Sequence, residues 1–144
     1  MHKLTVPIVL PDTTISEPRC KHPGHDAGYD LCSTKDIILW PFKVVKIPVN
    51  AQISIPQGFF ARITGRSGLS VNGILTIPGT VDSGYIGVIH AITMNLSFWP
   101  KKIRRGDRIA QMIVMPCASL DFRLVNRHEE TDRGSHGFMS TGLT

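Results

Sequence analysis

Short apolar stretches, each bounded by proline or glycine, recur along the chain and constrain its fold more than any other feature. Residues 59–64 alternate in the pattern of a half-buried strand, and 108–115 form a long apolar run ended by Pro116. No heptads, internal repeats or long helical patterns are present. Strands spaced in this way, with proline and glycine between them, predict an all-β sandwich, jelly roll or barrel. The strands expected are 4–10, 27–33 (strand or turn), 37–40, 43–47, 52–55, 59–64, 73–77, 87–96, 108–115 and 122–125.

The length of 144 residues predicts one domain with a single core. Three cysteines, an odd number without CxxC spacing, support neither a disulfide framework nor a zinc knuckle. The opening 4–10 is too short for a signal sequence and contains Pro7, so we expect a strand there and an intracellular protein, in cytoplasm or nucleus. Nothing approaches the length of a membrane span, and no membrane partner is expected.

The net charge of +5 is concentrated in a basic run at 101–108, inside which Arg105-Gly106-Asp107 resembles a cell-attachment tripeptide. A basic patch attracts polyanions such as nucleic acid or a nucleoside triphosphate. For the run by itself, a solvated structural role is favoured, and the tripeptide is also expected to be structural. The six histidines lack metal-binding spacing, and none is assigned to a metal.

The stretch 79–87 joins a turn signal to a long apolar run. Asp82 and Tyr85 lie in it among three glycines, and glycine reaches positive φ at little steric cost. One pocket can therefore hold both a carboxylate and a ring. An ordinary hairpin with a solvated Asp82 is the alternative.

Five stretches are polar and marked by glycine where a plain β protein needs only turns. They supply a carboxylate, arginines, hydroxyl groups and exposed amides, which suits a ligand that carries phosphates. The five are 27–31, 66–70, 79–87, 105–111 and 133–142. The second of them is also expected to open a short helix, with Ser67 as its cap.

In this order, the five stretches resemble the five motifs of the homotrimeric dUTPases, over roughly residues 26–142. The resemblance implies a jelly-roll β-barrel assembled as a homotrimer, whose three active sites are each built from three subunits. The barrel would occupy 1–126, and 127–144 would form a flexible tail that closes over the substrate. The reaction implied is hydrolysis of dUTP to dUMP and diphosphate, with Mg²⁺ held by the triphosphate and water rather than by protein ligands.

The resemblance assigns Asp82 as the general base that activates the water attacking the α-phosphorus. It places Tyr85 under the deoxyribose, where a ribose hydroxyl would clash, and the backbone of Gly79, Thr80 and Val81 at the uracil edge. Asp30 would support the arginine network. The remaining implied substrate contacts are Arg66, Ser67, Gly68 and Gln111 from the barrel and Arg133, Phe138, Ser140 and Thr141 from the tail.

The chain departs from the family pattern at four positions: Gly65 replaces a proline, Gly84 an acid, and His136 and Met139 stand where glycine is common. Met139 is the departure most expected to limit closure of the tail. The hairpin before Asp82 is short, as in retrovirus-type members, which suggests a viral origin.

Three other functions are open. The related dCTP deaminases share the fold, but they need a catalytic glutamate in the third motif, which this chain lacks. A viral relative with weak catalysis would act mainly as a host-protein-binding module. Binding of nucleic acid through 101–108 is the least favoured, and it would depend strongly on salt.

Overall fold

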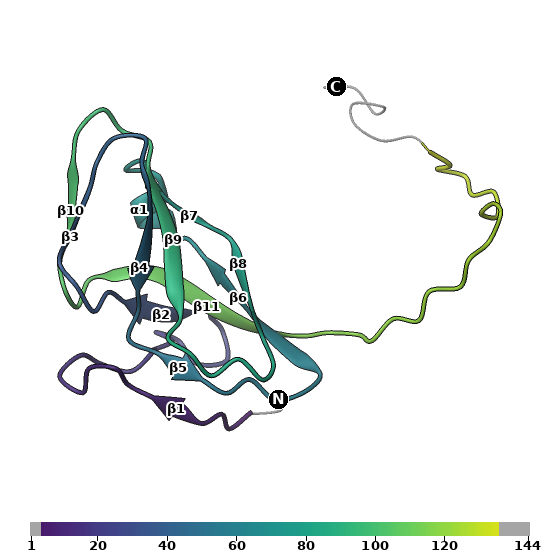
Figure 1. The fold of residues 1–144 in the computed structure, drawn as a ribbon, viewed down its shortest axis with the longest axis horizontal. Coiled ribbons are helices and arrows are strands. Elements are labelled where there is room, and N and C mark those ends of the chain that lie inside the picture. The colour runs from purple at the N-terminus through teal and green to yellow at the C-terminus, as the bar shows by residue number, and fades with distance from the viewer. Residues whose placement is uncertain (1–3, 136–144) are drawn as a thin grey trace.

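The computed structural model describes residues 4–135, and its regular elements are almost all short β-strands, as the sequence predicts (Figure 1). Among these residues a single short helix lies between the strands. The elements are β1 Ile8–Val9, β2 Tyr29–Cys32, β3 Ile37–Leu39, β4 Val44–Pro48, β5 Gln52–Ile53, β6 Phe59–Thr64, α1 Ser67–Ser70, β7 Ile74–Ile77, β8 Gly79–Asp82, β9 His90–Asn95, β10 Lys101–Ile103 and β11 Arg108–Pro116.

The strands form two main antiparallel sheets, in the orders β2-β11-β6-β8 and β4-β9-β7. Two smaller pairs, β1-β5 and β10-β3, extend the structure. Neighbours in each sheet are distant in the sequence, so the chain crosses repeatedly between sheets, as in a jelly roll. Within residues 4–135 no helix is long and apolar enough to cross a membrane.

Alternate side chains of the strands fill the core between the sheets. In β6, Ala61 and Ile63 are buried, whereas Arg62 between them is exposed. Leu31 of β2, Ile47 of β4 and the other buried aliphatic residues join the same cluster. Because successive side chains of a strand point to opposite faces, this pattern leaves polar residues outside.

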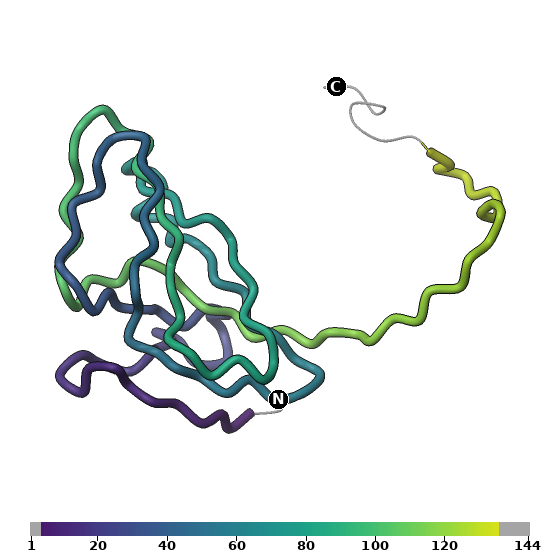
Figure 2. Tube along the Cα trace, in the orientation of Figure 1, coloured from purple at the N-terminus to yellow at the C-terminus, as the bar shows by residue number. Residues whose placement is uncertain are grey.

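The chain changes sheet at Pro78. Strand β7 pairs with β9 in one sheet, and β8, which follows after this single residue, pairs with β6 in the other. The trace passes from β7 into β8 without reversing direction (Figure 2). Strand β8 lies at the end of its sheet, so one of its backbone edges has no strand partner among the described residues.

Three expectations differ from the structure, and two of its strands, β8 and β10, were not expected. The first strand is limited to Ile8–Val9, and 122–125 form no strand. Helix α1 forms as expected, but its cap is Arg66, in extended conformation and without a side-chain capping bond, so the assignment of Ser67 as the cap was wrong. The expected hairpin arms are confirmed as β7 and β9, with β8 inserted after the first of them.

Candidate functional site

Three of the five glycine-marked stretches meet around Asp30 in β2. The Arg66 Nε donates to Asp30 Oδ1 at 2.8 Å, and the Arg108 guanidinium contacts Oδ2 at 3.2 Å. Arg66 also donates to the backbone carbonyl of Arg108 at 3.1 Å. One carboxylate therefore orients two arginines, one from the start of α1 and one from β11, which leaves a locally positive surface suited to phosphate oxygens.

Gln111 of β11 lies in the same region. Its Nε2 donates to the carbonyl of Gly65 at 2.9 Å. A Cβ at Gly28 would lie 2.2 Å from the Gln111 Oε1, so only glycine leaves room for this side chain. The Gln111 amide is thus confined between Gly28 and Gly65, and Gln111 lies opposite Asp30 in the sheet. We call Asp30, Arg66, Arg108 and Gln111 the Asp30 cluster.

Ser67 and Gly68 form the exposed first turn of α1, directly after Arg66. A Cβ at Gly68 would meet no atom within 4 Å, so the backbone of this turn is open to a ligand. Asn72 closes the turn by donating to the Gly68 carbonyl at 2.8 Å.

The third stretch lies elsewhere on the surface. Asp82 ends β8 and is exposed, as is Thr80, whereas the side chain of Val81 is buried in the core. Only the backbone of Val81 is therefore available to a ligand, at the open edge of β8.

Tyr85 is held rigidly in the turn that follows Asp82. Its hydroxyl donates to the Val88 carbonyl at 2.9 Å, and its amide to the Asp82 carbonyl at 3.3 Å. The ring lies against Gly87, where a Cβ would come within 2.5 Å of the phenol oxygen. Gly84 has a φ of +87°, a conformation that glycine adopts without strain. The turn thus presents a fixed, half-exposed ring.

Asp82 and the Asp30 cluster do not meet within one chain. Asp82 is opposite Phe60 in β6, whereas Gln111 is opposite Thr64, four positions further along the same strand. At about 3.3 Å per residue, Asp82 and Gln111 therefore lie about 13 Å apart along the strands. They also lie two strand spacings apart across the sheet. The structure therefore divides the predicted site residues into two groups.

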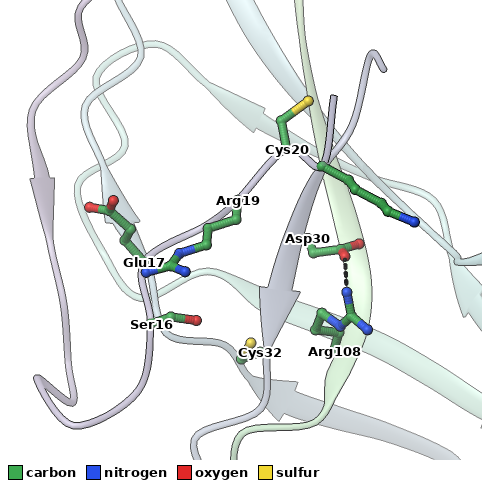
Figure 3. Close-up of a pocket in the computed structure, with 8 residues that line it drawn as sticks. Ser16, Glu17, Arg19, Cys20, Asp30, Cys32 and Arg108 are labelled. Atoms are coloured by element: carbon green, nitrogen blue, oxygen red, sulfur yellow. Dashed lines mark hydrogen bonds and ion pairs between the residues drawn. The ribbon is translucent and has the colours of Figure 1, made fainter. Parts of the chain in front are cut away.

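A cavity of about 220 Å³ lies beside the Asp30–Arg108 pair (Figure 3). Arg19 and Lys21 line it together with that pair. Burial raises the pKa of the Cys32 thiol, which also lines the cavity, so this sulfur favours its neutral form. The Arg19 carbonyl accepts a hydrogen bond from the Asp30 amide at 2.8 Å, which joins the loop to β2.

The tail residues are placed only in part. Arg133 is exposed on the segment that leaves the barrel after β11 (Figure 1). Phe138, Ser140 and Thr141 lie outside the described residues, as do the departures His136 and Met139.

Arg108 was not predicted as a site residue, although it shares Asp30 with Arg66. The signal that could have identified Arg108 is its position in the fourth glycine-marked stretch, 105–111. The tripeptide Arg105-Gly106-Asp107 is a turn: Asp107 accepts from the Arg104 amide at 2.8 Å, and Gly106 has a φ of +89°. The structural interpretation of the tripeptide is thus supported.

Comparison with known proteins gives consistent matches. The dUTPase family model matches residues 16–142. A deoxyuridine 5'-triphosphate nucleotidohydrolase of Nocardia farcinica is 39% identical over 141 residues, 95% of this chain and 85% of that protein. One of Avian adenovirus 8 is 39% identical over 117 residues, 81% and 72% of the two chains.

Solved structures agree with these matches. The Staphylococcus bacteriophage 80alpha dUTPase G164S mutant with dUpNHpp has a TM-score of 0.88 at 25% identity, with 98% of this chain and all of that chain covered. The relatives are bacterial and viral alike, so a viral origin for this chain stays a prediction.

Proposed function

This chain belongs to the dUTPase family, and on that premise we propose that it hydrolyses dUTP to dUMP and diphosphate. The observation that carries the proposal is the Asp30 cluster, in which Arg66 from the second motif and Arg108 and Gln111 from the fourth meet Asp30 of the first. Two oriented guanidinium groups and the open turn at Ser67 and Gly68 suit the oxygens of a triphosphate.

We propose that Asp82 acts as general base. The exposed carboxylate can accept a proton from a water molecule within hydrogen-bond reach. As the water oxygen bonds to the α-phosphorus, the bond from that phosphorus to the bridging α–β oxygen breaks. Its electrons leave with diphosphate, and the water proton passes to Asp82.

The separation of Asp82 from the Asp30 cluster supports a site shared between chains. We propose a homotrimer in which Asp82 of one subunit faces the Asp30 cluster of the next. The outer face of the β4-β9-β7 sheet supports assembly, because Leu75, Ile77 and Ile92 are 37%, 41% and 41% exposed there. Adjacent exposed aliphatic residues on one sheet face are typical of an interface.

The exposed edge of β8 and the turn that follows it, which contains Tyr85, would select the nucleotide. The open backbone of Gly79, Thr80 and Val81 can pair with the polar edge of uracil. The fixed Tyr85 ring would lie under the sugar and leave no room for a 2′-hydroxyl. Residues 127–144 would close over the substrate, with Arg133, Ser140 and Thr141 at the phosphates and Phe138 on the base.

Mg²⁺ is proposed to enter with the substrate. Among residues 4–135 no three His, Cys, Asp or Glu side chains are grouped to hold a metal ion. Mg²⁺ keeps much of its water and prefers phosphate oxygens, so triphosphate and water suffice as its ligands. The ion would neutralise charge on the leaving diphosphate.

A nucleotide panel tests the proposal. Diphosphate release is measured from dUTP, UTP, dCTP and dTTP with Mg²⁺, together with ammonia release from dCTP. Hydrolysis restricted to dUTP is the expected result. Absence of diphosphate release, or ammonia release from dCTP, would contradict the assignment.

A further inference from the structure

Two neighbouring loops at one end of the barrel expose four aromatic side chains to solvent. Trp40 and Phe42, between β3 and β4, are 58% and 54% exposed, and Phe98 and Trp99, between β9 and β10, are 79% and 75% exposed. We call these four residues the aromatic tip. The two loops lie together in Figure 1, and the Phe42 and Phe98 rings pack edge to face with centroids 5.5 Å apart.

The fold holds the aromatic tip in place through Asn95, which is fully buried. Its Nδ2 donates to the carbonyls of Leu39 at 2.9 Å and Trp99 at 2.8 Å, and its backbone carbonyl accepts from the Phe42 amide at 2.7 Å. Its Oδ1 accepts two hydrogen bonds from Ser97. One buried side chain therefore joins both loops.

Phe42 also adopts an unfavourable backbone conformation. Its φ of +59° is the only positive value among the described residues other than glycine. For a residue with a Cβ this conformation is sterically unfavourable. Strained backbone persists where the surroundings impose it, and it is concentrated at functional positions. The exposed rings are thus a built feature rather than a loose loop.

The surroundings of the aromatic tip are basic. Lys43 follows Phe42, and Lys101 and Lys102 follow Pro100. Between residues 37 and 106 the only acid is Asp82, which lies in β8 and outside both loops. The basic residues of that span are Lys43, Lys46, Arg62, Arg66, Lys101, Lys102, Arg104 and Arg105. The partner of this surface must therefore be anionic as well as apolar.

We propose that the aromatic tip docks on an anionic lipid surface. Tryptophan prefers the interface between lipid and water, and adjacent lysines are attracted to anionic headgroups. The exposed aliphatic residues Ile38 and Leu96 beside the tip gain from contact with acyl chains and offer nothing to a nucleic-acid base. Such peripheral docking needs no spanning segment, and it revises the expectation that no membrane partner exists.

Other partners fit less well. The edge-to-face packing of Phe42 and Phe98 leaves these rings poorly arranged for stacking on successive bases. A surface surrounded by lysines is not self-complementary, which disfavours a second copy of the chain. All four side chains are more than half exposed, so the tip presents a projecting surface.

Vesicle binding by the full-length protein tests the inference, and the chain offers an internal probe. Its two tryptophans, Trp40 and Trp99, both belong to the aromatic tip. We expect sedimentation with vesicles of phosphatidylcholine containing about 30% phosphatidylserine, a blue shift of tryptophan emission, and weakening as salt rises. Vesicles of phosphatidylcholine alone are expected to bind weakly.

Two variants locate the contact. Phe98→Ser combined with Trp99→Ser should weaken vesicle partition by at least about tenfold. Lys43→Gln combined with Lys101→Gln should remove most of the preference for the anionic lipid. As a matched control, Val71→Ser combined with Phe122→Ser removes two residues that are 84% and 90% exposed elsewhere, and it should bind as the unmodified chain does.

Three outcomes would overturn the inference. Equal binding to both kinds of vesicle would remove the charge argument, and no binding would remove the whole proposal. Association with a single-stranded oligonucleotide, or with further copies of the chain, that the Phe98→Ser and Trp99→Ser changes abolish would assign the aromatic tip to that partner instead. These readouts do not depend on dUTP hydrolysis.

Discussion

Gln111 is positioned by the absence of a side chain in its neighbour. At Gly28 a Cβ would lie 2.2 Å from the Gln111 Oε1 and 2.9 Å from its Cδ. The amide can therefore donate to the Gly65 carbonyl only while position 28 stays glycine. Gly28, in the stretch 27–31, therefore helps to place Gln111, in the stretch 105–111.

Gly28→Ala is expected to displace Gln111 and to lower dUTP hydrolysis by about ten- to a hundredfold, because a misplacement near 1 Å costs about that much. Gln111→Ala should give a similar loss. Since both changes remove the same contact, the double variant should lose no more than either single one. Losses that add in a double-mutant cycle of kcat/KM would contradict this coupling.

Asp82→Asn retains the shape of the side chain but removes its ability to accept a proton. Hydrolysis should fall by about 10²–10⁴-fold, the usual contribution of a general base. Nucleotide affinity, measured with a non-hydrolysable analogue, should change little. Asp121→Asn, at an exposed acid outside the motifs, is the control and should retain full activity. Comparable activity in both variants would remove Asp82 from the mechanism.

Site residues that belong to a recognised motif were predictable from the sequence, but their hydrogen-bond and ion-pair partners were not. Asp30, Arg66 and Gln111 were predicted, and the structure brings them together. Arg108 was not, because it stands in a basic run that reads as a solvated surface. Its ion pair depends on the register of β11 against β2, which shifts between Arg108 and Ala110. Such an irregularity leaves no mark in a sequence.

Among the elements, most strands lie where stretches bounded by proline or glycine predict them, and the errors concern strand pairing. Strands β8 and β10 were not predicted, although they pair with β6 and β3, and one predicted strand has no partner. Residues 122–125 have apolar character suited to a strand, yet Phe122 and Leu124 are 90% and 98% exposed. A strand needs a neighbour to satisfy its backbone, and this segment has none among the described residues of the chain. Local pattern alone therefore overpredicted it.

The loop after β1 is tied to the turn before β11 by one carboxylate. Asp12 accepts hydrogen bonds from the Thr14 hydroxyl and from the Arg105 guanidinium. These contacts, led by the one from Thr14, lower the pKa of Asp12 from 3.8 to about 2. The folded chain therefore favours the ionised form more strongly than the unfolded chain does.

This difference predicts a dependence of stability on pH. The contribution of Asp12 is fully present above about pH 4, and it is lost as the pH falls from about 4 to about 2, where the unfolded chain takes up the proton first. Asp12→Asn should lower stability at neutral pH and flatten its decline across that acidic range. Urea denaturation at several pH values measures both effects. An unchanged slope would show that Asp12 is not the group responsible.

For the whole molecule, the proposed trimer would bring the two groups of site residues together. The all-β class and jelly-roll architecture were predicted and are confirmed by the structure and its neighbours. The position of Asp82 relative to Arg66 was not predictable from pattern, because the spacing of residues along one chain gives neither the sheet register nor the contacts between chains. The order of the motifs identifies the residues involved, and the sheet register shows how far apart they lie.

Mixing inactive chains tests the shared site. Asp82→Asn and Arg66→Gln are each expected to be nearly inactive as homotrimers. After denaturation and refolding together in equal amounts, about a quarter of the interfaces should combine an intact Asp82 with an intact Arg66, and activity should return to about that level. Unmixed samples refolded separately are the control. If the mixture stays inactive while mixed trimers form, each site is built within one subunit.

The change of sheet at Pro78 has a mechanical consequence for such a trimer. One continuous stretch of backbone carries Leu75 and Ile77, on the outer face, and Asp82, the proposed general base. Because only Pro78 separates β7 from β8, a small rotation of one subunit against its neighbour would displace the Asp82 carboxylate. Substitutions at the outer face that preserve the trimer but alter its angle should therefore slow turnover more than they weaken nucleotide affinity.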